Sequence, residues 1–266
     1  MTGRSRSPTR SGAEHDLVEK TRAGLEALCE KHCIPESHGA GHAMRVLGHA
    51  DAALAAAEVP IAKSRSLAVR LAALLHDADD RKYFGSGPKG EYPNAHRLMR
   101  EAGAESGVIA DALRMIDLVS CSKNGNSAPQ EAASEPEWLW PRWADRLEAT
   151  GEIGVVRCWQ FNRELGDVPM FTESTPRPVS EEEVWKLGTP TRFEEYQARG
   201  GSSASMLDHY YDKLLQVARP PSELVQNRYL EEKMAEGAAP LVKILLAFGA
   251  TGEVPLEELR AMEARI

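Results

Sequence analysis

Apolar residues recur every three to four positions along most of this 266-residue chain, which is the spacing of one face of an α-helix. The period is clear in residues 14–33 and again in residues 206–217. No stretch alternates strictly between apolar and polar residues as a half-buried β-strand does, and no segment is repeated. The sequence therefore predicts an all-α fold in which helices bury their apolar faces against one another.

Helices are predicted wherever this period holds between residues that stop a helix, such as Pro35 and Pro60. The predicted ranges are 14–33, 41–60, 64–77, 95–102, 108–119, 145–156, 206–217, 224–234, 241–248 and 256–262. The third of these is so rich in Leu, Ala and Val that it predicts a central, buried helix. The Gly-rich, charged stretch 79–93 predicts a loop.

Composition divides the chain into three parts. Residues 1–13 carry arginines among Ser and Thr without an apolar stretch, which predicts a disordered tail and not a secretory signal. Residues 14–235 are predicted to form a helical-bundle domain. Within it, residues 166–204 are rich in Pro, Glu, Thr and Gly and predict an irregular excursion with one short helix near 181–187. Residues 236–266 predict a C-terminal helical extension.

Charge and cysteine spacing restrict the classes of partner. The 40 acidic and 32 basic residues give a formal net charge of -8, which disfavours dedicated binding to a nucleic-acid polymer. We find no uninterrupted apolar run long enough to cross a bilayer, so no membrane partner is expected. The four cysteines form no CxxC pair or zinc-finger spacing, so we expect reduced thiols and a cytoplasmic location. A small anionic substrate remains compatible with these totals if a metal or local cations neutralise it.

Four ionisable side chains stand out because each lies in or at the end of an otherwise apolar helix: His42, His76, Asp77 and Asp145. An unpaired charge in apolar surroundings costs on the order of several kcal/mol, which a divalent cation would offset. Two imidazole nitrogens and two carboxylate oxygens suit Mn, Mg, Fe, Co or Ni, and they leave coordination positions open for water and a phosphate oxygen.

These residues resemble the signature of the HD-domain phosphohydrolases, which is a His, a His-Asp doublet and a distant Asp. The corresponding segments here are GHAMRV, LLHDADD and WADRLEATGEIGVVR. Two further stretches, SCSKNG around Lys123 and DHYYDKLLQ around His209, are similar to a subgroup of small bacterial-type HD hydrolases. The resemblance covers about residues 15–165 and 205–235.

The resemblance implies an all-helical HD-domain bundle with the metal ligands His42, His76, Asp77 and Asp145, and with Mn or Mg as the favoured ion. It also implies hydrolysis of a phosphoester or phosphoanhydride in a small phosphorylated substrate, often a nucleotide. A catalytically silent metal- or nucleotide-binding regulatory protein is the alternative. The base of the substrate, the native metal and the formation of a homodimer are left open by the sequence.

Four residues are candidates for catalysis and substrate binding around the predicted metal. Asp80, three residues after Asp77, either orients the attacking water or caps the following segment. Lys82 lies close to it in sequence and is a candidate substrate-binding cation. Lys123 and Asn124, in a segment that breaks the helical period, are predicted to bind phosphate, with an exposed loop lysine as the alternative interpretation.

The sequence also suggests roles for several further histidines and for Arg146. His38 and His49 are rivals of His42, and His96 is the best candidate for a further ligand, although a mononuclear site is favoured. For Arg146 we expect a structural role that orients the metal ligands. His209 either stacks on a substrate base or packs on the core.

Overall fold

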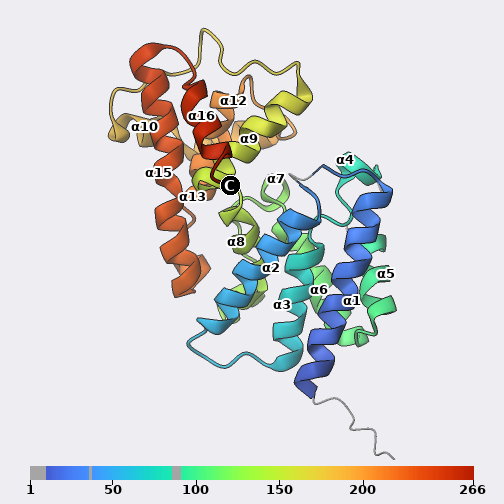
Figure 1. The fold of residues 1–266 in the computed structure, drawn as a ribbon. Helices are drawn as coiled ribbons and strands as arrows, with labels where there is room; N and C mark the ends of the chain where they lie inside the picture. Colours follow the sequence, from blue (N-terminus) through green and yellow to red (C-terminus); the bar gives the residue numbers. More distant parts are fainter. Residues whose placement is uncertain (1–9, 36–37, 86–90) are drawn as a thin grey trace, which may run out of the picture.

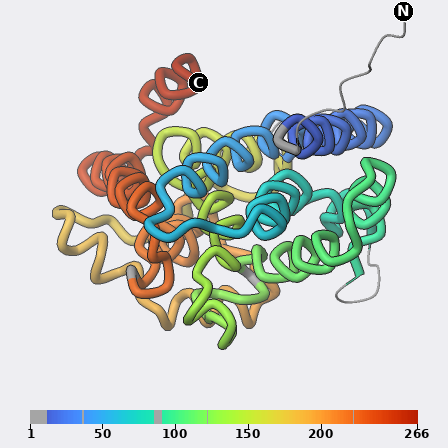
Figure 2. Tube along the Cα trace, turned by 90° about the horizontal axis from the view of Figure 1, so that it is seen from below, coloured from blue at the N-terminus to red at the C-terminus, as the bar shows by residue number. Residues whose placement is uncertain are grey.

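The computed structural model describes residues 10–35, 38–85 and 91–266, and all regular elements among them are helical. Figure 1 shows helices α1 to α6 gathered in one half of the molecule and α9 to α16 in the other, with α8 between them. In the view from below in Figure 2, α1 and α15 lie on opposite sides of the molecule. The predicted all-α fold is therefore confirmed.

Most helices in the described part of the chain are short, and three of them exceed fifteen residues. The first group contains α1 (Arg10–Lys31), α2 (Ala40–Ala55), α3 (Lys63–Leu75), α4 (Arg81–Phe84), α5 (Pro93–Ala102), α6 (Ser106–Val119) and α7 (Cys121–Asn124). Then follow α8 (Trp140–Leu147), α9 (Gly151–Leu165), α10 (Glu181–Leu187), α11 (Pro190–Ala198), α12 (Met206–His209), α13 (Leu215–Ala218), α14 (Ser222–Val225), α15 (Arg228–Thr251) and α16 (Leu256–Glu263). A π-helical turn, Tyr210–Leu214, joins α12 to α13.

Helix α3 is the centre of the first of two hydrophobic cores. Its residues from Leu67 to Leu75 are buried apart from Arg70, as the crowded apolar sequence predicted. Helices α2, α6 and α8 pack around it. The helix therefore ends inside the core, and His76 and Asp77 follow directly at that end.

The second core lies among α9, the helical segment 206–218, α15 and α16, and it contains Val155, Tyr210, Leu245 and Phe248. Helix α8 belongs to the first core and α9 to the second. The short turn between α8 and α9 therefore connects the two cores.

Helix α15 runs unbroken through Pro240, where the sequence predicted two helices over 224–234 and 241–248. It also passes through residue 236, where the C-terminal extension was predicted to begin. The two-helix prediction was wrong because apolar burial continues on both sides of the proline and outweighs its lost backbone hydrogen bond. The buried face contributes to both cores through Leu230, Met234, Leu241, Leu245 and Phe248.

By length and composition, α15 is the one helix in the described part of the chain that could span a membrane. In its most apolar window, 44% is buried inside the protein. The same length and composition are found in core helices of globular proteins. Its buried residues in both hydrophobic cores lead us to interpret α15 as a core helix.

The beginning of the chain differs from the predicted tail. Helix α1 begins at Arg10, so residues 10–13, which were predicted to be disordered, are helical. Residues 1–9 lie outside the described residues.

The predicted excursion over residues 166–204 contains more helix than expected. Its predicted short helix is observed as α10, and α11 is a second one. The start of α11 carries two signals that could have revealed it. The Thr189 hydroxyl accepts a hydrogen bond from the Arg192 amide, and Pro190 occupies the first turn, where its missing N–H costs nothing.

Candidate metal centre

Three helices bring the four predicted ligands together. His42 lies in the first turn of α2, His76 caps the end of α3 with Asp77 next to it, and Asp145 lies in α8. Helices α2, α3 and α8 all pack against one another. The packing of α2 and α8 on the buried helix α3 thus brings together residues as far apart in sequence as His42 and Asp145.

The ligand atoms converge on one point. The Nε2 atoms of His42 and His76 are 3.2 Å apart. Oδ1 of Asp145 lies 3.3 Å from the first and 3.4 Å from the second. Oδ2 of Asp77 lies 3.5 Å from Nε2 of His76 and 3.9 Å from Nε2 of His42. The ligand atoms of His42, His76 and Asp77 lie within 4.8 Å of one another, as a shared ion requires.

Burial divides the four ligands into two pairs. The side chains of His42 and His76 are each 1% exposed, whereas those of Asp77 and Asp145 are each 29% exposed. The imidazoles therefore form the closed wall of the site, and the carboxylates border its open side. A donor set with one open side suits a catalytic ion, because water and substrate need free coordination positions.

A hydrogen bond fixes which nitrogen of His76 faces the other ligands. Nδ1 lies 2.9 Å from the carbonyl oxygen of Ala73, and because a carbonyl only accepts, Nδ1 must carry the proton. Nε2 is then the nitrogen that can bind a metal, as for metal-bound histidines generally. The residues present therefore fit a divalent ion.

The electrostatics of the cluster favour a positive charge at its centre. Burial alone would lower the pKa of His76, but the carboxylates of Asp77 and Asp145 raise it well above its ordinary value. Burial likewise opposes ionisation of Asp77, yet His76 and His42 hold its pKa below the usual range. The pKa of Asp145 is lowered in the same way. The site attracts either a proton or a metal ion.

Glu148 supports His42 from the side opposite the cluster, a role that the sequence analysis missed. Oε2 of Glu148 lies 3.7 Å from Nδ1 of His42 and accepts a 2.6 Å hydrogen bond from Nε of Arg45. Oε1 lies 3.4 Å from Nε2 of His49. These partners hold the pKa of Glu148 well below its usual range, although burial opposes this. The available signal was its position one turn after Asp145 in the segment ADRLEA.

The three rival histidines lie elsewhere. His49 binds Tyr229 through Nδ1 at 2.7 Å and faces Glu148 through Nε2. His38 lies 3.3 Å from the ammonium of Lys82, and burial together with Lys82 lowers the pKa of His38 to about 4. His96 is exposed on α5. None of the three belongs to the cluster of ligand atoms found among the described residues.

Asp80 shows the capping contact and also lies near the metal ligands. Its Oδ1 accepts a 3.0 Å hydrogen bond from the Lys82 amide, which caps α4. Burial and the negative charge of Asp77 raise the pKa of Asp80. Oδ2 lies 4.0 Å from the Lys82 ammonium. That ammonium also lies 5.0 Å above the ring of Phe161, at the edge of the second half of the molecule.

Lys123 and Asn124 are both bound to the end of α6. The Lys123 ammonium donates to the carboxylate of Asp117, and the side-chain amide of Asn124 donates to the Asp117 carbonyl at 2.8 Å. Asp117 also accepts a hydrogen bond from the hydroxyl of Tyr92 at 2.7 Å. Within the described residues we find no hydrogen bond from Lys123 or Asn124 to the four ligands. Their phosphate-binding role stays a prediction.

Arg146 is fully buried and holds the loop after α7. It donates to the side chain of Asn126 at 2.5 Å and to the carbonyl of Gly125. Its guanidinium lies 4.6 Å from the ring centre of Trp143. Arg146 therefore has a structural role: it fixes the loop after α7 and packs against Trp143.

His209 packs in the second half of the molecule. Its ring lies edge-on to Tyr196, with 5.5 Å between the ring centres. Nδ1 of His209 lies 3.4 Å from the hydroxyl of Ser203. Burial, Lys213 and Lys82 lower the pKa of His209 to about 3, so the ring is neutral at physiological pH.

A helical bundle that carries His, His-Asp and Asp in this order and geometry has the fold of an HD-superfamily hydrolase. Solved structures have the same fold. An HD-superfamily hydrolase of Bacillus thuringiensis matches with a TM-score of 0.58 at 18% identity, covering 88% of this chain and 96% of that one. A Lactobacillus plantarum protein matches at 0.61 and 21% identity, covering 89% and 96%. The Lin1889 protein of Listeria innocua matches at 0.55 and 16% identity, covering 88% and 94%.

The sequence itself places the chain in a narrower family. It belongs to the same family as the uncharacterized protein L803 of Acanthamoeba polyphaga mimivirus. The two are 33% identical over 246 residues, which is 88% of this chain and 96% of the relative. No protein-family model matches the chain.

Proposed function

We propose that this protein is a metal-dependent phosphohydrolase that cleaves a phosphoester or phosphoanhydride of a small substrate, with nucleotides as the first class to test. The observation that carries the proposal is the convergence of two imidazole nitrogens and two carboxylates on one point with one open side. A structural neighbour that is an HD-superfamily hydrolase supports the same class of reaction.

His42, His76, Asp77 and Asp145 would hold the divalent ion, with Mn or Mg as the ions we favour. Such an ion would polarise a phosphoryl oxygen and lower the pKa of a water molecule, so that attack on phosphorus becomes feasible near neutral pH. The imidazoles would bind the ion through Nε2, and Asp77 and Asp145 would supply the negative charge that attracts a cation.

Asp80 is the residue that we propose to orient the attacking water and to take its proton. Its Oδ1 accepts a hydrogen bond from the Lys82 amide, and its Oδ2, 4.0 Å from the Lys82 ammonium, would face the water molecule. Its raised pKa improves it as a proton acceptor. As the water attacks phosphorus, the bond to the leaving oxygen breaks and the proton passes to Asp80. Lys82 would bind the phosphate on the same side.

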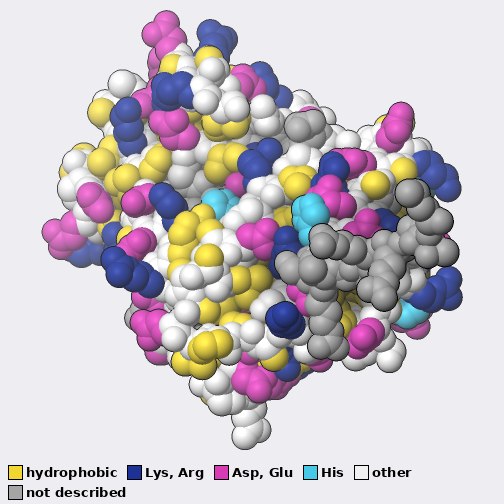
Figure 3. Space-filling view, turned by 60° about the horizontal axis from the view of Figure 1, so that its bottom comes forward, with side chains coloured by type: hydrophobic (Ala, Val, Ile, Leu, Met, Phe, Trp, Pro, Cys, Tyr) yellow, Lys and Arg dark blue, Asp and Glu magenta, His cyan; other side chains and the backbone are white. Residues whose placement is uncertain are grey.

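The surface fits a small substrate better than a nucleic-acid polymer. Basic and acidic side chains are interspersed over the face shown in Figure 3, where no broad basic band is visible outside the grey atoms. Binding of a nucleic-acid polymer, with its phosphate backbone, requires a concentrated cationic surface. We accordingly propose a soluble, cytoplasmic enzyme that acts on a small molecule.

Phosphate release from a panel of nucleotides, with Mn or Mg added, tests this function. We expect turnover by the wild type and none by Asp77→Ala, while Asp16→Ala, whose carboxylate is 63% exposed on α1, keeps full activity. Absence of turnover by the wild type on every substrate would reject the proposal.

A catalytically silent binding protein is the alternative. The capping contact of Asp80 is the observation in its favour, because a carboxylate used only as a cap would leave the site without a base. Asp80→Asn separates the two functions. Loss of turnover with intact metal binding in the variant supports the enzyme, whereas metal binding without turnover in both proteins supports the binding protein.

A further inference from the structure

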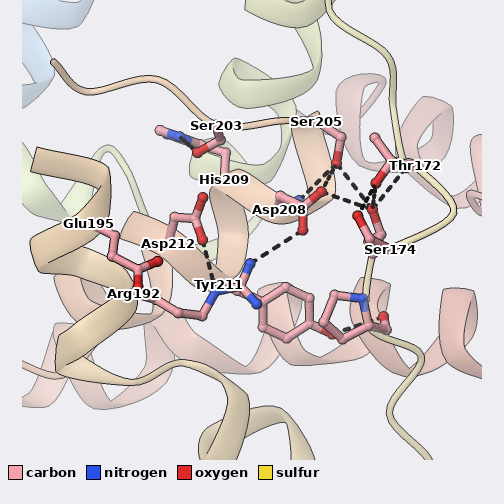
Figure 4. Close-up of polar contacts among 12 residues, drawn as sticks. Thr172, Ser174, Arg192, Glu195, Ser203, Ser205, Asp208, His209, Tyr211 and Asp212 are labelled. Atoms are coloured by element: carbon pink, nitrogen blue, oxygen red, sulfur yellow. Dashed lines mark hydrogen bonds and ion pairs between the residues drawn. The ribbon is translucent and has the colours of Figure 1, made fainter. Parts of the chain in front are cut away.

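A cavity of about 500 Å³ in the second half of the molecule is bordered by the carboxylates of Asp208 and Asp212. Figure 4 shows Arg192 and Ser205 donating to these carboxylates, at distances from 2.6 to 3.3 Å. Arg199 donates to Oδ2 of Asp212 at 3.3 Å, so all four carboxylate oxygens accept bonds from the protein. Among the described residues, no side chain of this cluster forms a hydrogen bond or ion pair with a metal ligand. The cluster therefore holds its own helices together.

A second polar network lies behind His42, with Glu148 at its centre. The two oxygens of the Glu148 carboxylate face different partners. Oε2 accepts a hydrogen bond from Nε of Arg45 at 2.6 Å and lies 3.7 Å from Nδ1 of His42. Oε1 lies 3.4 Å from Nε2 of His49. Because the Glu148 side chain is only 3% exposed, its position is set by these partners.

His49 continues this network to α15. Its Nδ1 lies 2.7 Å from the hydroxyl of Tyr229, which is in the first turn of α15. Nε2 of His49 faces a carboxylate, which only accepts hydrogen bonds, so Nε2 is the nitrogen that carries the proton. In the neutral ring, Nδ1 then accepts from the tyrosine hydroxyl. The contacts thus run from Tyr229 through His49 and Glu148 to His42.

A separate contact fixes the start of α15 on α2. Nδ2 of Asn227 donates to the carbonyl of Ala53 at 2.9 Å, and Oδ1 of Asn227 accepts from the Leu230 amide and caps α15. Ala53 lies one turn after His49 on α2. The start of α15 is therefore docked beside His49 by a contact that bypasses the Tyr229 hydroxyl.

The network ends at the nitrogen of His42 that points away from the metal site. A histidine that binds a metal through Nε2 carries its proton on Nδ1, and that N–H group requires an acceptor. Nδ1 of His42 is buried and has no hydrogen-bond partner among the described residues. The Glu148 carboxylate, 3.7 Å away, is placed to accept from it. The hold on Glu148 therefore influences how well His42 binds an ion.

We propose that His49 and Tyr229 position the metal ligand His42 through Glu148, so that the affinity of the site for a divalent ion depends on a hydroxyl of α15. The inference rests on the metal site of the proposed function and deepens it, because it adds two positioning residues that contribute no ligand atom. His49, which the sequence left as a rival of His42, acts on the ion from behind the ligands.

Calorimetric titration of the metal-free, full-length protein with Mn tests this proposal. Residues behind a metal-bound histidine typically contribute about 10- to 100-fold to metal affinity, so we expect a loss of about tenfold in His49→Leu and about threefold or more in Tyr229→Phe. His49→Gln keeps an N–H group that can donate to Glu148 and should retain more affinity than His49→Leu.

A double mutant tests whether the effect passes through Glu148. Tyr229→Phe should weaken Mn binding in the wild type but add little to the loss caused by Glu148→Gln, because residues of one network are not additive. A full additional loss in the double mutant would show that Tyr229 acts by another route and would overturn the proposal.

Two control variants separate this network from the stability of the fold. Asn227→Ala removes the contact of α15 with α2 that bypasses His49. Ser205→Ala removes a hydroxyl that donates to a carboxylate at 2.6 Å in the cluster of Figure 4. Both should lower the melting temperature of the metal-free protein while Mn affinity stays that of the wild type.

Unchanged Mn affinity in Tyr229→Phe and His49→Leu overturns the proposal. An equal loss of affinity in Asn227→Ala does so too, because docking of α15 would then be sufficient to explain the effect. A wild type that binds neither Mn nor Mg also rejects it. If His49→Leu does not fold, Tyr229→Phe and the double mutant decide the outcome.

Phosphate release by the same variants distinguishes this proposal from the proposed function. Turnover by a wild type whose Mn affinity is indifferent to both substitutions would reject the positioning role and leave the phosphohydrolase standing. Mn binding that depends on His49 and Tyr229, without turnover of any substrate, would reject the enzyme and leave the positioning role standing.

Discussion

His42 and His76, 34 positions apart in the chain, face each other through Nε2 atoms that are 3.2 Å apart. If both Nε2 atoms carried a proton, the two N–H groups would repel each other at this distance. The two Nε2 atoms therefore hold either one proton or one metal ion between them. Because Nδ1 of His76 must donate to the carbonyl of Ala73, only Nε2 can change its proton content when a metal binds.

Metal affinity should therefore rise with pH. Asp77 and Asp145 raise the pKa of His76, so a proton on Nε2 competes with the metal at pH values below that raised pKa. We expect Mn affinity to increase about tenfold per pH unit up to the pKa of His76 and to level off above it. Titrations at several pH values measure this slope, and an affinity independent of pH would contradict it.

Metal content should distinguish the ligands from their rivals. His42→Ala should lose the ion, because its Nε2 lies within 3.3 Å of Oδ1 of Asp145. His96→Ala should keep a full equivalent, since His96 is exposed on α5. Elemental analysis of the purified variants measures the ratio directly. Loss of metal in His96→Ala would point to a second ion.

Glu148→Gln should weaken metal binding without removing a ligand. The change removes the negative charge 3.7 Å from Nδ1 of His42. Mutation of a residue that contacts a metal-bound histidine from behind typically lowers the metal affinity about 10- to 100-fold. Glu152→Gln, which removes an exposed carboxylate paired with Arg265 in the same region, is the control and should leave metal affinity unchanged.

The same variant should change the response of the metal-free protein to acid. The folded-state pKa of Glu148 is lowered from an ordinary 4.5, so its stabilisation is present above that value and is lost as the pH falls. Denaturant unfolding at pH 7 and pH 4 should show a smaller decrease in free energy of unfolding for Glu148→Gln than for the wild type. An identical decrease would show that Glu148 is not among the titrating groups.

Gly154→Ala should destabilise the turn between α8 and α9. A Cβ at Gly154 would lie 2.2 Å from the carbonyl carbon of Ala149, a backbone atom that cannot rotate away. Overpacking of this kind costs about 1–3 kcal/mol. Gly107→Ala in α6, where a Cβ meets nothing within 4 Å, is the control and should not destabilise the protein. Denaturant midpoints of the two variants give the comparison.

Local sequence was sufficient for the helical class and for the identity of the four convergent residues. The apolar period of 3.6 residues is a property of each helix alone, and the segments LLHD and ADRLEA are each continuous in sequence at the end of one helix. The same local reasoning missed α11 and divided α15 at Pro240, because the burial that stabilises both comes from distant partners.

The tertiary structure decided which charges are paired. Lys123 lies in a segment that resembles the HD-domain subgroup, yet its ammonium is paired with a carboxylate of another helix, that of Asp117. Glu148 likewise gains its role from His42, more than a hundred positions earlier. Sequence spacing determines which side chains share a helix face, whereas contacts between helices determine which charges lie within hydrogen-bond distance, and only those contacts set the pKa values and the ligand geometry of the site.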